Sequence, residues 1–169
     1  AESAVASDEY YTLYHGIEAQ SLQHLGYGTS SAKTTTLSFY VKSSLTGTFG
    51  LSLYQADGSG RIINKTYTID SANTWERKTI NIVGDTAGLI NNDNGGGIYI
   101  YWIFGSGSGY DGGTTATTWA NYATTNFVHS SSSDALVTTA GATWQITGIQ
   151  LEVGENASDF EHRSFGEEL

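Results

Sequence analysis

The chain has 169 residues and a formal net charge of −10, from seven Lys and Arg against 17 Asp and Glu. This acidic balance repels phosphate backbones and anionic lipid, so we expect no nucleic-acid partner and no membrane insertion. The absence of cysteine excludes disulfides, thiolate metal sites and cysteine nucleophiles. Abundant glycine, threonine, serine and tyrosine favour a single all-β domain with many turns.

The first residues are small and polar, which predicts a mobile lead-in over 1–9 before a β-sandwich domain over 10–160 and a C-terminal tail over 161–169. The chain contains no methionine, including an initiator, so we expect a processed product or an excised piece of a longer polypeptide. The stretch "YYTLYHGIEA" (10–19) reads as a strand, and "QSLQHL" (20–25) as one helical turn.

Clear alternation of apolar and polar residues begins at "TLSFYVKS" (36–43) and continues in "TFGLSLYQ" (48–55). Alternation with period two is typical of a strand with one buried face. The intervening "SSLTG" suits a hairpin between the two strands. Further strands are expected at 61–69, 75–83, 98–104, weakly at 126–130, and at 143–153 with an irregularity at Gly148.

About eight short strands at regular spacing predict an antiparallel β-sandwich of two sheets, of the jelly-roll, galactose-binding-like type; an up-and-down barrel is the alternative. The predicted core is apolar and lies on the inward face of each strand. It comprises Leu37, Phe39, Val41, Phe49, Leu51, Leu53, Ile80, Ile82, Ile98, Ile100, Trp102, Ile149 and Leu151.

The stretch "GIYIYWIFGSGSGYDGGTTATTWANY" (97–122) is rich in aromatic rings. On its strand, Phe104 continues the core face of Ile98, Ile100 and Trp102, while Tyr99 and Tyr101 are expected to face outward. Outward tyrosines serve either as cross-strand packing or as a binding surface.

The glycine-rich loop that follows carries Tyr110, Trp119 and Tyr122, which we expect to lie near one another at one end or face of the sandwich. These rings either tuck into the edge of the sandwich or form a platform for sugars. In the second reading a flat ring stacks on the C–H face of a pyranose, and Asp111 and Asn121 bind its hydroxyls.

Catalysis and metal binding have weaker signals. Glu18, Glu76 and Glu152 are the candidate carboxylates of a glycosidase, yet each fits a strand end or edge equally well. The loop "NNDNGGG" (91–97) contains the oxygen ligands that calcium prefers, but it lacks the spacing of a calcium loop and suits a turn better. We therefore expect no enzyme activity and no cofactor, with a structural calcium ion as the alternative.

Three blocks resemble a domain of tail-fibre and other virion structural proteins of marine bacteriophages. They are "GIEAQSLQHLGYGTSSAKTTTLSFYVKSSLTGTF" (16–49), "TIDSANTWERKTINIVGDTAGLINNDNGGG" (68–97) and "ITGIQLEVGENASDFEHRSFGEEL" (146–169). More distantly, the chain resembles carbohydrate-binding modules with a galactose-binding-like jelly roll. Those modules often hold a structural calcium ion through an aspartate early in the last strand, where this chain has Thr147 and Gly148.

The resemblance implies a module on the virion surface, or otherwise extracellular, that meets a cell-surface glycan or polysaccharide. It also implies a homotrimer in the parent protein. Two alternatives stay open: a virion assembly or decoration domain without a ligand, and a carbohydrate-binding module cut from a polysaccharide-degrading enzyme.

Overall fold

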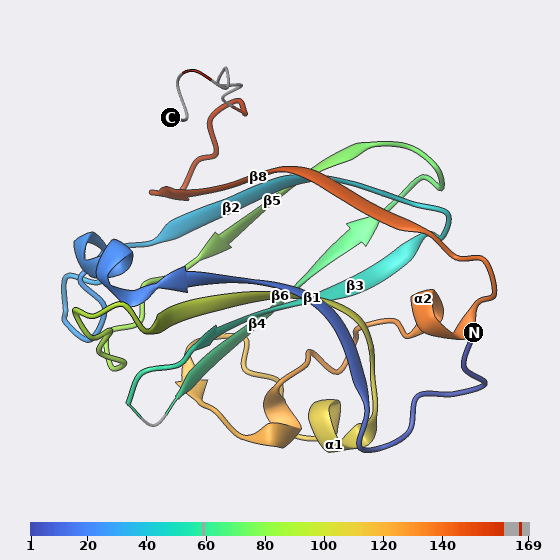
Figure 1. The fold of residues 1–169 in the computed structure, drawn as a ribbon, viewed down its shortest axis with the longest axis horizontal. Helices are drawn as coiled ribbons and strands as arrows, with labels where there is room; N and C mark the ends of the chain where they lie inside the picture. The colour runs from blue at the N-terminus through green and yellow to red at the C-terminus, as the bar shows by residue number, and fades with distance from the viewer. Residues whose placement is uncertain (59, 161–165, 167–169) are drawn as a thin grey trace.

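The structure is a computed structural model that describes residues 1–58, 60–160 and 166. Two antiparallel sheets pack face to face (Figure 1), with strand orders β1-β6-β3-β4-β7 and β5-β2-β8. The large sheet contains β1 (Tyr10–Glu18), β6 (Gly96–Ser106), β3 (Gly47–Gln55), β4 (Arg61–Ile69) and β7 (Ala120–Asn121). The small sheet contains β5 (Glu76–Ile82), β2 (Thr35–Ser43) and β8 (Trp144–Val153). The predicted two-sheet sandwich is confirmed, and two separate sheets exclude the barrel.

The core between the sheets follows the predicted alternation. All predicted core residues are buried except two on β8. Leu151 is half-buried against the core, and Ile149 is 41% exposed, so its predicted burial is wrong. The reason is that β8 is an edge strand, which the opposite sheet covers only in part. Phe104 is likewise half-buried, with its ring 4.9 Å from that of Trp144.

The predicted irregularity at Gly148 is confirmed. The register between β2 and β8 shifts between Ser38 and Tyr40, and Gly148 opposite them has a φ of 58°. That left-handed conformation is costly for residues other than glycine, so glycine is the residue that lets the strand accommodate an extra position.

The hairpin expected across "SSLTG" is wrong, because β2 lies in the small sheet and β3 in the large one. Gly47, at the start of β3, has a φ of 134°, which lets the chain turn from one sheet to the other. The hairpin forms instead between β3 and β4, where the backbone N–H of Gly60 donates to the carbonyl of Asp57 at 3.2 Å.

Four short helices complete the described part of the fold: η1 (Ala19–Leu25), α1 (Ser108–Asp111), η2 (Thr124–Asn126) and α2 (Ala135–Thr138). The helical turn expected at 20–25 is confirmed as η1, which buries Leu22 and Leu25. The weak strand expected at 126–130 is wrong. There the chain leaves η2 and the N–H of Val128 bonds to the carbonyl of Tyr110 rather than to a strand of either sheet.

A third layer covers the outer face of the large sheet. Residues 107–133, which we call the covering loop, run beneath this sheet in the yellow-to-orange part of the chain (Figure 1). A second apolar cluster forms there from Ile62, Ile103, Ala116, Phe127 and Val128. Strands β4 and β6 therefore bury side chains on both faces, as fully covered strands do.

The lead-in is hydrogen-bonded to the fold. The N–H of Glu2 donates to the carbonyl of Val137 at 2.9 Å, and that of Gly109 to the carbonyl of Ser7 at 2.8 Å. Gly107 lies directly against the carbonyl of Ala6, where a side chain would clash. Of the predicted tail 161–169, all but residue 166 lie outside the described residues.

Candidate functional site

A pocket of about 150 Å³ lies on the outer face of the large sheet, and every residue that lines it is aromatic. Three of the rings come from strands and three from the covering loop. They belong to Tyr10, Tyr54, Tyr101, Tyr110, Tyr122 and Phe127. We call this cavity the aromatic pocket.

The strand tyrosines reach the pocket because of strand alternation. Leu53 on β3 and Trp102 on β6 point into the core between the sheets, so their neighbours Tyr54 and Tyr101 point to the opposite face. On the sheet, Tyr54 lies opposite Tyr99 and Ser52 opposite Tyr101. Side chains paired in this way lie within contact distance on one face.

Phe127 lies at the centre of the pocket and is only 6% exposed. Its ring centroid is 5.0 Å from that of Tyr101 and 5.3 Å from that of Tyr10, both in edge-on geometry. Tyr110 packs 4.6 Å from Tyr10, and Tyr122 packs 4.9 Å from Tyr54. Each loop ring is thus held against a strand ring at a centroid distance typical of aromatic pairs, and the pocket is largely preformed.

Buried polar groups fasten the covering loop to the sheet below the pocket. Asn64 on β4 is 1% exposed and donates through its amide to the carbonyl of Phe127 at 3.0 Å. Ser52 on β3 donates to the same carbonyl at 2.7 Å. The side-chain oxygen of Asn64 accepts from the N–H of Ala116 at 2.8 Å. These polar groups satisfy one another and fix the loop at two points, as buried polar groups in a native fold do.

The structure brings together three of the predicted site residues, Tyr101, Tyr110 and Tyr122, as lining of the aromatic pocket. Tyr99 lies beside them, with its ring 6.3 Å from that of Tyr101. Asp111 follows Tyr110, and its carboxylate accepts a hydrogen bond from the hydroxyl of Ser106 at 3.0 Å.

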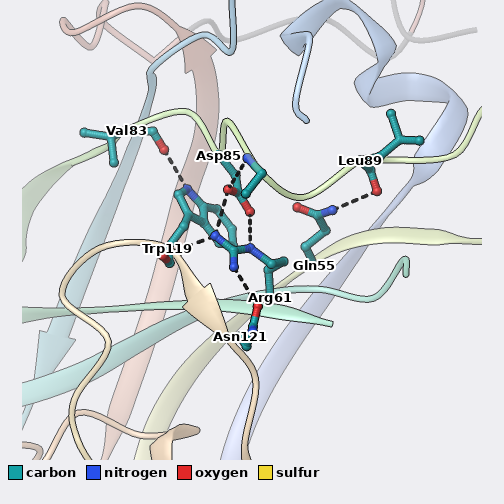
Figure 2. A network of polar contacts seen from close by, with 8 residues as sticks. Gln55, Arg61, Val83, Asp85, Leu89, Trp119 and Asn121 are labelled. Atoms are coloured by element: carbon teal, nitrogen blue, oxygen red, sulfur yellow. Dashed lines mark hydrogen bonds and ion pairs between the residues drawn. The ribbon is translucent and has the colours of Figure 1, made fainter. Parts of the chain in front are cut away.

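Asn121 and Trp119 belong to a different network, which is shown in Figure 2. The indole N–H of Trp119 donates to the carbonyl of Val83 at 2.7 Å. Its ring packs edge-on against Tyr27 at 5.8 Å and joins the core between the sheets. The expectation that Trp119 lies with the other two loop rings is wrong, because this hydrogen bond draws its side chain toward the β5–β6 connection.

The centre of that network is an ion pair between Arg61 and Asp85 (Figure 2). The guanidinium donates to both carboxylate oxygens, at 2.7 and 3.0 Å, and also to the side chain of Asn121 at 2.8 Å. Burial raises the pKa of Asp85, but the hydrogen bonds from Arg61 and the N–H of Ala87 outweigh it, so that pKa lies below its usual value. The network is a structural clamp that joins the β5–β6 connection to the start of β7.

Sequence reasoning missed four rings of the outer face: Tyr10, Tyr14, Tyr54 and Phe127. Tyr54 carried a usable signal, since it alternates with core residues on its strand. Phe127 carried none, because its position depends on how the covering loop folds back onto the sheet. The adjacent pair Ile62 and Ile63, both fully buried, was a signal that the outer face is covered.

The aromatic pocket is electrically neutral, since no lining residue carries a charge. Burial raises the pKa of Tyr101 to about 12, and neighbouring tyrosines act in the same direction. Burial also raises the pKa of Tyr54. At neutral pH both hydroxyls are protonated, and each can donate and accept a hydrogen bond.

The candidate carboxylates have local structural partners. Glu76 accepts from the backbone N–H groups of Asp70 and Ser71 and from Lys78, while Glu152 accepts from Ser158. In the loop predicted as a turn, Asp93 accepts from the N–H of Gly95 at 2.9 Å. Across the described residues, no group of three His, Cys, Asp or Glu side chains is placed to hold a metal ion. In the same part of the chain, no helix is long and apolar enough to cross a bilayer.

Comparisons of the chain with protein-family models, with curated proteins and with solved structures found no match. The aromatic pocket and its surroundings are therefore the basis for assigning a function.

Proposed function

We propose that this domain is a non-enzymatic carbohydrate-binding module that binds a cell-surface glycan through the aromatic pocket. The observation that carries the proposal is the lining: five tyrosines and one phenylalanine from separate segments converge on one cavity, with no charged side chain among them. A sugar offers apolar C–H groups on its ring faces and hydroxyls at its rim. Tyrosine matches both, since it combines a flat apolar ring with a polar tip.

Packing alone is a weaker explanation for this composition. A layer that only covers a sheet is served best by side chains without polar atoms, and buried tyrosine is favoured only where its hydroxyl has a partner. The pocket is instead open, with Tyr10 44% exposed. An apolar hollow with a few polar groups inside it is the usual form of a small-molecule site.

The resemblance to phage tail-fibre domains suggests where such a module works. We place it on the virion surface or another extracellular surface, as part of a parent protein that assembles as a homotrimer. Host recognition through a glycan fits a neutral pocket on an acidic domain, because the negative charge limits adhesion to anionic surfaces.

A second candidate function is assembly without a ligand. The edge strands β1 and β8 expose apolar side chains, with Leu13 41%, Ile149 41% and Val153 48% exposed. Exposed edges of this kind can pair with another chain. This candidate predicts that variants of these three residues change the oligomeric state of the full-length parent protein, and that pocket variants do not.

The proposal is tested by a glycan array with the wild-type domain and with Tyr110→Ala and Tyr122→Ala. Loss of binding in both variants is expected. The matched control is Tyr40→Ala, which removes a tyrosine from the small sheet at a position between the core residues Phe39 and Val41. A silent array with folded protein, or equal binding by all the variants, would overturn the proposal.

A further inference from the structure

We infer that the binding site extends past the aromatic pocket onto an open row formed by Tyr99 and Tyr14, and that it takes at least two consecutive uncharged residues of a glycan chain. This inference rests on the proposed function and names the class of ligand. The site differs from one that binds a single sugar residue, because the row adds a second stacking surface beside the pocket.

The row is continuous with the pocket wall. The ring of Tyr99 lies 6.3 Å from that of Tyr101 and 6.4 Å from that of Tyr54, both of which line the pocket. The ring of Tyr14, on the neighbouring strand β1, lies 5.4 Å from Tyr101 and 6.1 Å from Tyr99. A chain that places one residue in the pocket therefore meets Tyr99 or Tyr14 with the next.

Within the row, Tyr14 is more exposed than any ring that lines the pocket. Tyr14 is 60% exposed, whereas Phe127 in the pocket is 6% exposed. Among the described residues, the rings of Tyr14 and Tyr99 pack against strand tyrosines and against no ring of the covering loop. A hollow beside a more exposed ring suits a chain that places one residue in the pocket and the next on the row.

Two glycines hold the ring of Tyr99 in place. A Cβ at Gly16 on β1 would lie 2.9 Å from Cε1 and 3.1 Å from Cδ1 of Tyr99, closer than such atoms normally approach. At Gly96, a Cβ would clash with the hydroxyl of the same ring. The ring thus crosses over the backbone of β1, which is possible because neither glycine has a side chain. A ring fixed in this way loses little freedom when a ligand stacks on it.

The charge of the site selects against anionic sugars. The pocket lining, Tyr99 and Tyr14 contribute no charge, and the domain as a whole has a net charge of −10. A uronate or sulfated chain would enter a negative field without a cation in the pocket lining to pair with, and burying an unpaired charge is costly. An uncharged chain has no such penalty.

The test measures affinity against chain length by titration calorimetry. The probes are malto-, cello- and manno-oligosaccharides of one to six residues, with oligogalacturonates of equal length as the anionic series. We expect affinity in at least one uncharged series to rise about tenfold or more between the monosaccharide and the trisaccharide. Tyr14→Ala and Tyr99→Ala should flatten this rise and leave monosaccharide affinity within about twofold.

Gly16→Ala tests whether the position of the Tyr99 ring matters, because the added methyl group displaces the ring without removing it. It should also flatten the rise with chain length. His15→Ala is the matched control, since it changes an exposed neighbour on the same strand and should keep the rise. Tyr14 is exposed enough that its loss leaves the fold intact, which circular dichroism verifies.

The outcomes separate the two proposals. Equal affinity for mono- and oligosaccharides, or an unchanged rise in both tyrosine variants, would overturn the extended site while the proposed function stands. Tighter binding of oligogalacturonates than of every uncharged series would overturn the uncharged class. Failure of the folded protein to bind any saccharide, here and on the array, would overturn the proposed function and this inference with it.

Discussion

The side-chain amide of Asn64 donates a hydrogen bond to the carbonyl of Phe127, so a buried residue of β4 holds the ring at the centre of the aromatic pocket. Asn64 does not line the pocket itself. The geometry of the candidate site therefore depends on a polar group that lies between the sheet and the covering loop, below the surface that a ligand would touch.

Asn64→Ala should lower the free energy of unfolding by about 1–3 kcal/mol, because the buried N–H of Ala116 loses its acceptor. It should also weaken glycan binding, since Phe127 and the loop rings lose their anchor. Urea denaturation and calorimetry measure the two effects. Thr68→Ala, at an exposed position of the same strand, is the control and should change stability by less than about 0.5 kcal/mol. Unchanged stability in Asn64→Ala would contradict the anchoring role.

Trp119→Ala should destabilise the domain by about 2–3 kcal/mol and leave glycan affinity nearly unchanged. The estimate lies below that for a fully buried tryptophan because this ring is half-buried. Trp119→Phe retains most of the packing on Tyr27 and loses the bond to Val83, so it should cost only about 1 kcal/mol. Thermal denaturation of both variants tests whether Trp119→Ala loses more stability than Trp119→Phe. If the Trp119→Phe protein is stable but no longer binds glycan, Trp119 is part of the binding site.

Arg61→Met should destabilise the domain by about 3–5 kcal/mol, because it leaves the carboxylate of Asp85, which is 2% exposed, without its cation. Arg77→Met is the control. Its partner Asp159 is fully exposed, so its loss should cost less than about 1 kcal/mol.

Arg61→Met should also reverse the pH dependence of stability that Asp85 contributes. In the wild type the folded pKa of Asp85 is lowered, so its stabilisation is present above about pH 4 and is lost as the pH falls through the folded value. Without Arg61, burial dominates and raises that pKa, so stability is lost as the pH rises above about 4. Urea midpoints between about pH 3 and 7 measure the difference. Parallel curves for the two proteins would contradict this account.

Alkaline pH should unfold the domain through its buried tyrosines. Burial raises the pKa of Tyr27 to about 12, that of Tyr101 to about 12, and that of Tyr67 further. Since these values exceed the unfolded value of about 10, the folded state retains its protons and stability falls as the pH rises above 10. Parallel titrations by tyrosinate absorbance and circular dichroism should show that these groups ionise as the sheets unfold. Complete ionisation with a native dichroism spectrum would contradict this prediction.

The sequence was sufficient to predict the strands and their inward faces, because alternation is a local pattern that each strand carries itself. Leu37, Phe39 and Val41 are buried as their spacing predicts. It did not predict which sheet each strand joins. The "SSLTG" turn looks the same whether β2 and β3 pair or separate, since partner choice depends on contacts with distant β5, β6 and β8.

The candidate site was predicted in part for the same reason. Tyr99 and Tyr101 alternate with core residues, so their outward direction could be inferred. The placement of Trp119 and Phe127 could not, because it depends on hydrogen bonds between the covering loop and distant residues: Val83 for Trp119, and Asn64 and Ser52 for Phe127. Loop residues without periodicity carry no local signal of the face that they will cover.

The two faces of strand β6 can change independently in evolution. Its Trp102 face belongs to the core between the sheets and its Tyr101 face to the aromatic pocket. Substitutions at the outward positions and in the covering loop can therefore alter the proposed binding surface while the sandwich core stays as it is. A library restricted to these positions would diversify specificity on an unchanged scaffold, in the way that antibody loops vary on a constant framework.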